Sequence, residues 1–337
     1  MNHRAHDAAI ATGAPPAKQP AGQGARTRAM GRRRFNATLA AGAGVWAGGV
    51  SLSAMSATST PLITRPVPAG HGETLPVIGL GTWQVFDVAS GSAEYGEARA
   101  TLQALADGGG TVVDSSPMYG RSEAITGNLM EELAVRQRLF VATKVWTRGR
   151  EEGIAQMKTS MQRLRVETLD LMQVHNLVDT DAHLATLAKW REQKRVRYLG
   201  ITHYHAGAHA DLERALIKHR VDFVQCNYSL AEPEAEKHLL DFCREQGAAV
   251  LINRPFAEGS LFSRVRGKPV PAWTAQELGI QSWGQYFLKW IAGHPAVTCV
   301  IPGTRNPKHL ADNLGAARGA LPDAAQREKM RKEFAAL

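Results

Sequence analysis

The segment TVVDSSPMYG at residues 111–120 decides how the rest of the sequence is interpreted. Its first three residues are apolar or β-branched, which is typical of the end of a short buried strand. Asp114 stands at the carboxyl end of that strand, and Tyr119 follows in the next loop. The segment therefore predicts a strand that brings a carboxylate and a phenol to the same edge of a sheet.

Two later strands end in a similar way, at regular distances along the chain. LFVATK ends at Lys144, 30 residues after Asp114, and LDLMQVH ends at His175, 31 residues after Lys144. One strand, one helix and their loops need about 30 residues, so this spacing indicates successive βα units of a parallel sheet.

The alternation of apolar runs and helical periodicity continues through the chain and predicts eight strands. They are expected at residues 77–83, 110–114, 139–145, 169–175, 197–202, 223–228, 248–254 and 297–302. Eight βα units over about 260 residues favour an α/β fold of the closed (β/α)8 TIM-barrel type over an open doubly wound sheet. No GxGxxG follows any strand, which weakens the open dinucleotide-binding sheet further.

In such a barrel all strand ends lie on one rim, so Asp114, Tyr119, Lys144 and His175 are expected to meet. Tyrosine has an ordinary pKa near 10, and we expect Lys144 to lower it while Asp114 holds Lys144 in place. His175 would donate a hydrogen bond to a carbonyl oxygen. Each residue alone also has a structural interpretation, as a cap, an ion-pair partner or a packed side chain. Together they indicate proton transfer to a carbonyl that receives a hydride.

The sequence from about residue 72 to 320 resembles the aldo-keto reductase superfamily. VVDSSPMYGRSE is similar to the segment that carries the family's catalytic Asp and Tyr, VATKVW to its lysine strand and MQVHN to its histidine strand. The resemblance implies that Asp114, Tyr119, Lys144 and His175 form the catalytic tetrad, with Tyr119 as the general acid in reduction. It implies an NAD(P)H-dependent oxidoreductase that converts small aldehydes or ketones to alcohols.

The resemblance also implies a nicotinamide cofactor on the rim, although two positions depart from the family. His203 stands where the family has Asn, and Asn253 stands where it commonly has an aromatic residue that stacks on the nicotinamide. Tyr228 or Phe256 is the candidate replacement for that ring. IPGTRNPKHLADN is similar to the family's adenosine-phosphate segment. The implied cofactor contacts are Thr202, His203, Gln225, Arg254, Phe256, Gly303, Thr304, Arg305, His309, Asp312 and Asn313.

NADP(H) is favoured over NAD(H), which stays possible, because Arg305 with Lys308 or His309 can meet a 2′-phosphate. A solvated loop position is the alternative for Arg305. The implied substrate pocket consists of Trp83, Met118, Trp146 and Asn176 and suits apolar carbonyl compounds. The Trp residues can equally be rim packing.

No metal site is predicted, because the three cysteines, Cys226, Cys243 and Cys299, are widely spaced and offer neither a metal pattern nor a disulfide framework. The formal charge of +9 is concentrated near the start of the chain: residues 1–57 hold seven Lys or Arg residues and one acid. The remainder is close to neutral, which argues against a nucleic-acid partner. The sequence does not indicate an oligomeric state.

Residues 1–60 are expected to be a disordered basic tail followed by a signal segment, and residues 61–337 the barrel. Arg32, Arg33 and Arg34 precede a weakly apolar run that ends in small residues, which resembles a twin-arginine export signal. Cleavage is expected between Ala54 and Thr60. This predicts a periplasmic protein that uses the twin-arginine translocation machinery. A disordered tail with a chance apolar stretch, and a cytoplasmic or membrane-retained protein, are the alternatives.

Two other functions stay open from the sequence. Asn253 and His203 motivate a low-turnover nicotinamide-binding sensor or regulatory subunit on the same barrel. A barrel lyase or isomerase that uses Lys144 and Tyr119 without nicotinamide is the third possibility.

Overall fold

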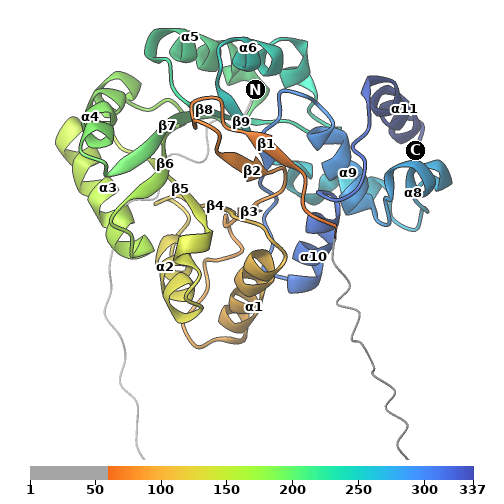
Figure 1. The fold of residues 1–337 in the computed structure, drawn as a ribbon, viewed down its shortest axis with the longest axis horizontal. Coiled ribbons are helices and arrows are strands. Elements are labelled where there is room, and N and C mark those ends of the chain that lie inside the picture. The colour runs from red at the N-terminus through yellow and green to blue at the C-terminus, as the bar shows by residue number, and fades with distance from the viewer. Residues whose placement is uncertain (1–59) are drawn as a thin grey trace, which may run out of the picture. The chain divides into compact units, whose positions relative to one another are not determined.

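A closed parallel barrel forms the centre of the computed structural model, which describes residues 60–337 (Figure 1). Its eight strands follow one another in chain order around the sheet. Parallel bridges from Ile78 to Val300 and from Gly81 to Gly303 join the last strand to the first. The strands are β3 (Leu80–Gly81), β4 (Val112–Asp114), β5 (Phe140–Val145), β6 (Leu169–His175), β7 (Val196–Thr202), β8 (Phe223–Asn227), β9 (Ala249–Asn253) and β10 (Cys299–Val300).

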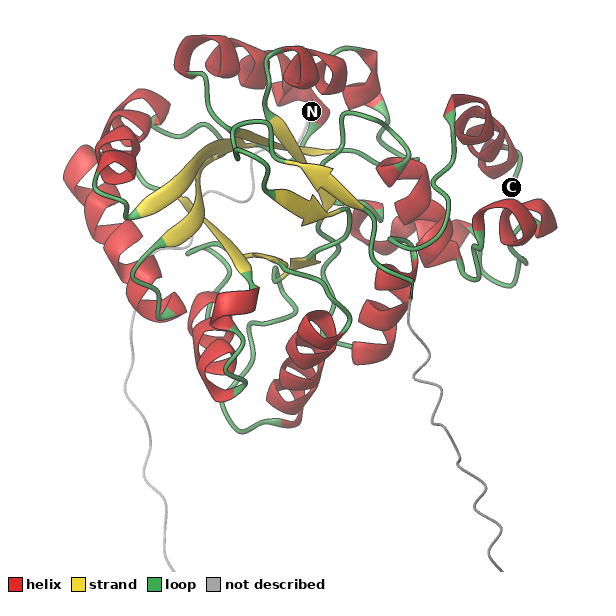
Figure 2. Ribbon diagram, viewed as in Figure 1, coloured by secondary structure: helices red, strands yellow, loops and turns green. Residues whose placement is uncertain are grey.

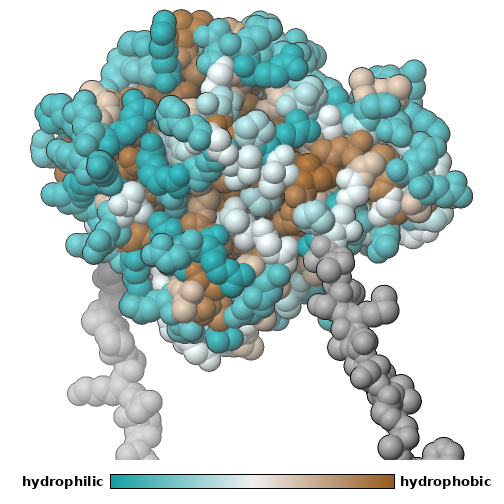
Figure 3. Space-filling view, in the orientation of Figure 1, coloured by the Kyte–Doolittle hydropathy of each residue, from teal (hydrophilic) through white to brown (hydrophobic). Residues whose placement is uncertain are grey.

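Helices surround the barrel on the outside, as the red ribbons of Figure 2 show. They present mainly hydrophilic side chains at the periphery of the molecule (Figure 3). The helices are α1 (Ala93–Asp107), α2 (Ser122–Glu132), α3 (Arg150–Leu164), α4 (Thr180–Glu192), α5 (His209–His219), α6 (Leu239–Glu245), α7 (Ser260–Arg264), α8 (Ala272–Leu278), α9 (Trp283–Ala292), α10 (Pro307–Gly315) and α11 (Ala324–Ala335). Apolar residues between strands and helices form the larger core.

The predicted (β/α)8 fold is confirmed: seven strands lie inside their predicted ranges, and β7 begins one residue before its range. The first and last strands are the shortest, with two residues each, and glycines interrupt the first. Ser122, which Arg121 precedes, is the first residue of α2. Its hydroxyl donates to the carbonyl oxygen of Thr82, and thereby ties α2 to the loop after β3.

A two-stranded hairpin closes the amino end of the barrel. Its antiparallel strands are β1 (Thr64–Pro66) and β2 (Thr74–Pro76). Leu75 packs into the second core, inside the barrel, with Phe140 and Phe223, which are the first residues of their strands. Burying one such apolar side chain stabilises the fold by about 1.5–3 kcal/mol. The carboxyl ends of the strands therefore form the open rim.

Candidate active site

A buried ion pair lies at the centre of the rim. Lys144 Nζ donates to Asp114 Oδ2 and to the carbonyl oxygen of Ser115, the latter at 2.7 Å. The side chains of Lys144 and Asp114 are buried. Charges buried in this way must be paired and hydrogen-bonded, and here the lysine has two oxygen partners. The pair fixes the position of the ammonium group.

Two glutamines complete the surroundings of Asp114. Its Oδ1 accepts from Gln173 Nε2 at 2.9 Å and from Gln225 Nε2 at 3.0 Å. Gln173 was not among the predicted site residues, although a signal exists: it lies two positions before His175, so both side chains share one face of β6. Gln225 is expected at the nicotinamide amide, but in this structure its amide nitrogen donates to side chains inside the barrel.

Tyr119 and His175 lie beside this ion pair. Lys144 Nζ is 5.0 Å from the centre of the Tyr119 ring. The Tyr119 and His175 ring centres are 6.2 Å apart and the rings are nearly perpendicular. Ser116 Oγ is 3.2 Å from His175 Nδ1. The structure therefore brings the four predicted tetrad residues together.

Burial dominates the electrostatics of the tetrad. Burial raises the pKa of Tyr119, and the opposing effect of Lys144 does not cancel it. The pKa of Tyr119 is thus above its ordinary value, and the downward shift expected from Lys144 in the sequence is wrong. Burial lowers the pKa of Lys144, but Asp114 and Tyr119 outweigh it, so the net shift is upward. Burial, then Lys144, then His203 lower the pKa of His175 to about 2. At neutral pH the site holds an ammonium, a protonated phenol and a neutral imidazole.

The rim next to the tetrad carries buried polar oxygens that accept no hydrogen bond from residues 60–337. Asn253 Nδ2 donates to the carbonyl oxygen of His203 at 3.1 Å and to Gln225 Oε1 at 3.3 Å, but Asn253 Oδ1 has no partner in the described part of the chain. Among the same residues Asn176 Oδ1, beyond the end of β6, has none either. Such acceptors are costly unless a donor reaches them, so they indicate a place for a ligand that carries N–H or O–H groups.

Arg254 and Phe256, which follow β9, contact other residues of the protein. Arg254 donates to Glu232 Oε1 at 3.0 Å and to Glu258. Phe256 packs against Phe262 and Phe287, with ring centres 4.9 and 6.4 Å away.

Tyr228 is fully buried and does not replace the missing aromatic residue at position 253. Its ring centre lies 5.0 Å from that of Trp290, and its hydroxyl is bonded to Arg327. No face of the Tyr228 ring is therefore open to a nucleotide, and the sequence-based alternative that it covers the nicotinamide is wrong.

The predicted adenosine-phosphate segment divides into two parts. Arg305 and His309 lie on the surface at the start of α10, where Asn306 caps the helix. Arg305 Nε donates to Glu97 Oε2 at 2.9 Å, an ion pair that is largely exposed to solvent. Gly303 pairs with the first strand, and Asn306 N donates to Thr304 Oγ1 at 3.0 Å.

Asp312 and Asn313 face the interior side of α10. Asp312 accepts from Ser282 Oγ at 2.6 Å and from Gln285 Nε2 at 2.8 Å, which ties α10 to α9. Asn313 is buried. Thr202 ends β7 and is buried as well, close to the tetrad histidine because Thr202 pairs with His175 in the sheet.

Large apolar side chains surround the entrance. Trp83, Met118 and Trp146 are 42%, 41% and 41% exposed, and the Trp146 ring centre is 6.2 Å from that of His175. Asn176 and His203 line a cavity of about 410 Å³ that extends outward between α4 and α5. The predicted pocket residue Asn176 and the predicted cofactor residue His203 thus share one wall.

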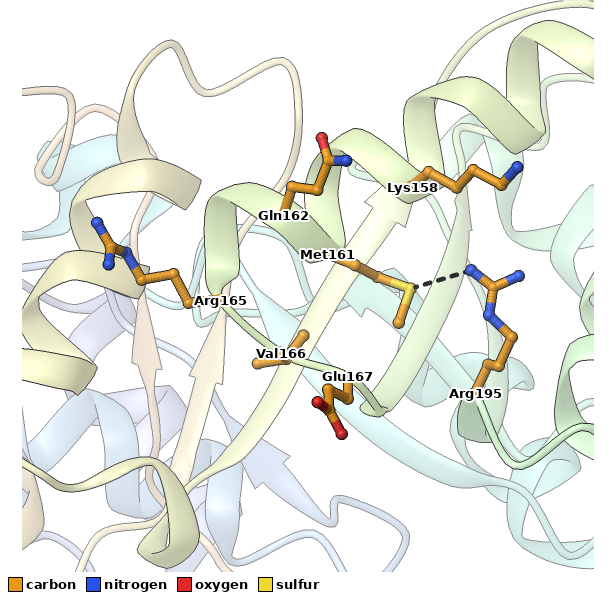
Figure 4. A pocket seen from close by; sticks show the side chains of 7 residues that line it. All are labelled: Lys158, Met161, Gln162, Arg165, Val166, Glu167 and Arg195. Atoms are coloured by element: carbon orange, nitrogen blue, oxygen red, sulfur yellow. Dashed lines mark hydrogen bonds between the residues drawn. The ribbon is translucent and has the colours of Figure 1, made fainter.

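A second cavity, of about 350 Å³, lies away from the rim. Its lining includes Val166, Glu167 and Arg195, which precede the amino ends of β6 and β7. In Figure 4 the Arg195 side chain extends toward Met161, and the guanidinium lies 3.9 Å from the Met161 sulfur. This cavity is therefore not part of the tetrad site.

Residues 60–337 contain no group of three or more His, Cys, Asp or Glu side chains placed to hold a metal ion. The cysteines are buried and unpaired. Within the same residues, no helix has the length and apolar character that a membrane crossing requires. The predicted signal segment lies outside the described residues.

Comparison with known proteins identifies the family. A sequence profile of the Aldo/keto reductase family matches residues 77–328, and the chain belongs to this family. It is 26% identical over 302 residues to aldo-keto reductase yakc [NADP(+)] of Schizosaccharomyces pombe, covering 76% of this chain and 88% of that protein. It is 27% identical over 249 residues to glyoxal reductase of Bacillus subtilis, covering 72% of this chain and 83% of that protein. An aldo-keto reductase from Klebsiella pneumoniae solved with NADPH has a similar fold, with a TM-score of 0.67, 23% identity and coverage of 81% and 96%.

Proposed function

We propose that this chain is an NADP(H)-dependent reductase that converts small aldehydes or ketones to alcohols, with Tyr119 as the proton donor. Membership of the aldo/keto reductase family supports carbonyl oxidoreduction in general. The observation that carries the finer proposal is the buried ion pair of Lys144 with Asp114 beneath the ring of Tyr119. This arrangement places a fixed positive charge where a tyrosinate would form.

The residues of the rim fit a nicotinamide cofactor. The unpartnered Oδ1 atoms of Asn253 and Asn176 are acceptors for a carboxamide N–H₂ group, and Thr202 adds a hydroxyl. The likeness to yakc [NADP(+)] and to the Klebsiella enzyme with NADPH supports the phosphorylated form. When bound, the reduced nicotinamide supplies the hydride.

Each tetrad residue then has a defined task. Tyr119 keeps its proton at neutral pH because burial raises its pKa, and it releases the proton only when a substrate oxygen gains negative charge. Lys144 stabilises the tyrosinate that is left. If the hydroxyl of Ser116 donates to His175 Nδ1, the neutral ring carries its proton on Nε2, where it can donate to the carbonyl oxygen.

Replacing Tyr119 with Phe tests the proposal. The hydroxyl is lost while the ring remains, so we expect kcat to fall at least about 100-fold with unchanged circular dichroism and NADPH affinity. Tyr204→Phe is the matched control, since this exposed tyrosine lies on the rim after β7. Undiminished carbonyl reduction by Tyr119→Phe would remove the basis of the proposal.

A sensor with little turnover is the second candidate, and Asn253 favours it because no aromatic side chain stands there to cover the nicotinamide ring. NADPH binding by fluorescence and NADPH oxidation over a panel of aldehydes separate the two functions. Tight binding without oxidation of NADPH in the presence of any aldehyde supports the sensor. Turnover supports the reductase.

We also propose export by the twin-arginine route, on the basis of Arg32 and Arg33 before an apolar run. Changing both arginines to lysine should leave the protein in the cytoplasm, measured by fractionation. An unchanged distribution of the protein would contradict this route and favour the cytoplasmic or membrane-retained alternatives.

A further inference from the structure

Ser116 contacts both residues that would face a substrate oxygen. Its hydroxyl oxygen lies 3.2 Å from His175 Nδ1, and its carbonyl oxygen accepts from Tyr119 N at 3.0 Å. The Ser116 side chain is fully buried, although serine is a residue type that is mostly exposed in proteins. One buried residue thus joins the loop that carries Tyr119 to strand β6, which ends at His175.

The segment around Ser116 is held in place from two sides. Ser115 N donates to the carbonyl oxygen of Ala142 in β5 at 2.9 Å, and Ser115 Oγ lies 2.9 Å from Thr82 Oγ1, directly after β3. The backbone next to Ser116 is therefore fixed on both sides of β4. Only rotation about its side-chain bond is left to direct the Ser116 hydroxyl.

Counting donors and acceptors gives the direction of the bond between Ser116 and His175. A serine hydroxyl has one proton to donate, and among residues 60–337 the only acceptor for it is His175 Nδ1. Met118 N already donates to the same hydroxyl oxygen, at 3.4 Å. If Nδ1 donated as well, the buried hydroxyl proton would have no partner, which is costly. The hydroxyl therefore donates to Nδ1, and the neutral imidazole carries its proton on Nε2.

We propose that Ser116 is a positioning residue that directs the Nε2–H of His175 toward the substrate oxygen and keeps it in register with the Tyr119 hydroxyl. The inference rests on the proposed reductase function. Two donors must meet one carbonyl oxygen, and such an arrangement tolerates displacements of only about 0.5 Å. The Ser116 hydroxyl also disfavours the other neutral form of His175, in which an unprotonated Nε2 would face the carbonyl oxygen and two acceptors would meet.

The decisive variant is Ser116→Ala, which removes the hydroxyl and leaves the backbone bond to Tyr119. Ser160→Ala is the matched control, because Ser160 is an equally buried serine on α3 whose hydroxyl has no hydrogen-bond partner among residues 60–337. The full chain is labelled with nitrogen-15 histidine, and proton–nitrogen correlation spectra at pH 7 show which ring nitrogen carries the proton. His175→Gln identifies the signals of His175.

The spectra test the orientation of His175 without any turnover. We expect a single neutral form with the proton on Nε2 in wild type and in Ser160→Ala, and a mixture of both neutral forms in Ser116→Ala. A proton on Nδ1 in wild type would overturn the inference, and so would an unchanged His175 spectrum in Ser116→Ala.

Turnover separates the role of Ser116 from the proposed function. With glyoxal and NADPH, we expect the kcat of Ser116→Ala to fall about tenfold, because a hydrogen bond to the developing oxyanion is misaligned. The Kd for NADPH of both variants and the kcat of Ser160→Ala should stay within about twofold of wild type. If wild type shows the Nε2 proton but reduces no aldehyde, the reductase function fails while the orientation of His175 by Ser116 is supported. If Ser116→Ala reduces glyoxal as fast as wild type, the function stands and the inference fails.

Discussion

The ion pair of Lys144 with Asp114 allows a quantitative prediction that does not depend on any substrate. Both side chains are buried, so Asp114→Asn leaves an ammonium without its counter-charge, and Lys144→Met leaves the carboxylate with only its two glutamine donors. Removing one partner of a buried pair typically costs about 3–5 kcal/mol. We expect Asp114→Asn near the upper end of this range and Lys144→Met near the lower end.

The double variant distinguishes this reasoning from simple loss of contacts. Asp114→Asn with Lys144→Met removes both charges, and neutral replacements of a buried pair are often close to neutral in stability. We therefore expect the free energy of unfolding of the double variant to lie within about 2 kcal/mol of the wild-type value. The coupling energy between the two substitutions should then be about 3 kcal/mol or more. The assay is urea unfolding at pH 7, followed by far-ultraviolet circular dichroism.

The exposed pair of Arg121 with Asp87, 2.8 Å apart, is the control for this cycle. Both side chains are largely in water, where such pairs contribute at most about 1 kcal/mol. A double-mutant cycle on this pair should therefore give little coupling. If the losses of unfolding free energy at Lys144 and Asp114 simply add, as expected at the exposed pair, then the two buried charges do not stabilise each other. That result would refute the reasoning.

Three further outcomes are expected. Arg305→Ala should raise the Kd for NADPH at least about fivefold and leave that for NADH within twofold, measured by fluorescence titration; equal loss for both would contradict a 2′-phosphate contact. Burial lowers the pKa of His175 to about 2 and that of His203 to about 4, so the unfolded chain binds more protons than the folded chain below pH 6.5. The free energy of unfolding should therefore fall as the pH drops from 6.5 to 4. His175→Gln should make this decrease smaller. Gly127→Ala should destabilise by about 1–3 kcal/mol in thermal melts, because its Cβ would overlap a carbonyl oxygen of α3, whereas Gly96→Ala on α1, with open space around it, should be neutral or stabilising.

The barrel was predictable because its strands are short apolar runs at nearly constant spacing. Three tetrad residues stand at or next to strand ends, so their convergence follows from the fold alone. Tyr119 lies in a loop, so its place on the rim was inferred from its closeness to Asp114 in the sequence, and the resemblance of VVDSSPMYGRSE to the family assigned it the general-acid role.

Contacts across the barrel were not predictable, since they depend on which side chains meet in three dimensions. Nothing local indicates that Gln173 and Gln225 share Asp114 Oδ1, or that Tyr228 is enclosed by Trp290 and Arg327. The predicted direction of the pKa shift of Tyr119 was wrong for the same reason. Lys144 does lower this pKa as expected, but burial, which the sequence does not reveal, raises it by more.

The hairpin of β1 and β2 lies on the face of the barrel opposite the tetrad, and this face suits attachment of the protein to a partner or a support. Residues next to it are fixed to the amino-end face. Ile63 N donates to the carbonyl oxygen of Ala317 at 2.7 Å, and Arg318 donates to the carbonyl oxygens of Thr60 and of Gly108, the C-cap of α1. Thr60 thus lies on the face opposite the rim. A fusion partner or a solid support joined directly to Thr60 would leave the tetrad facing outward, and the tetrad of the immobilised barrel should stay accessible to solutes.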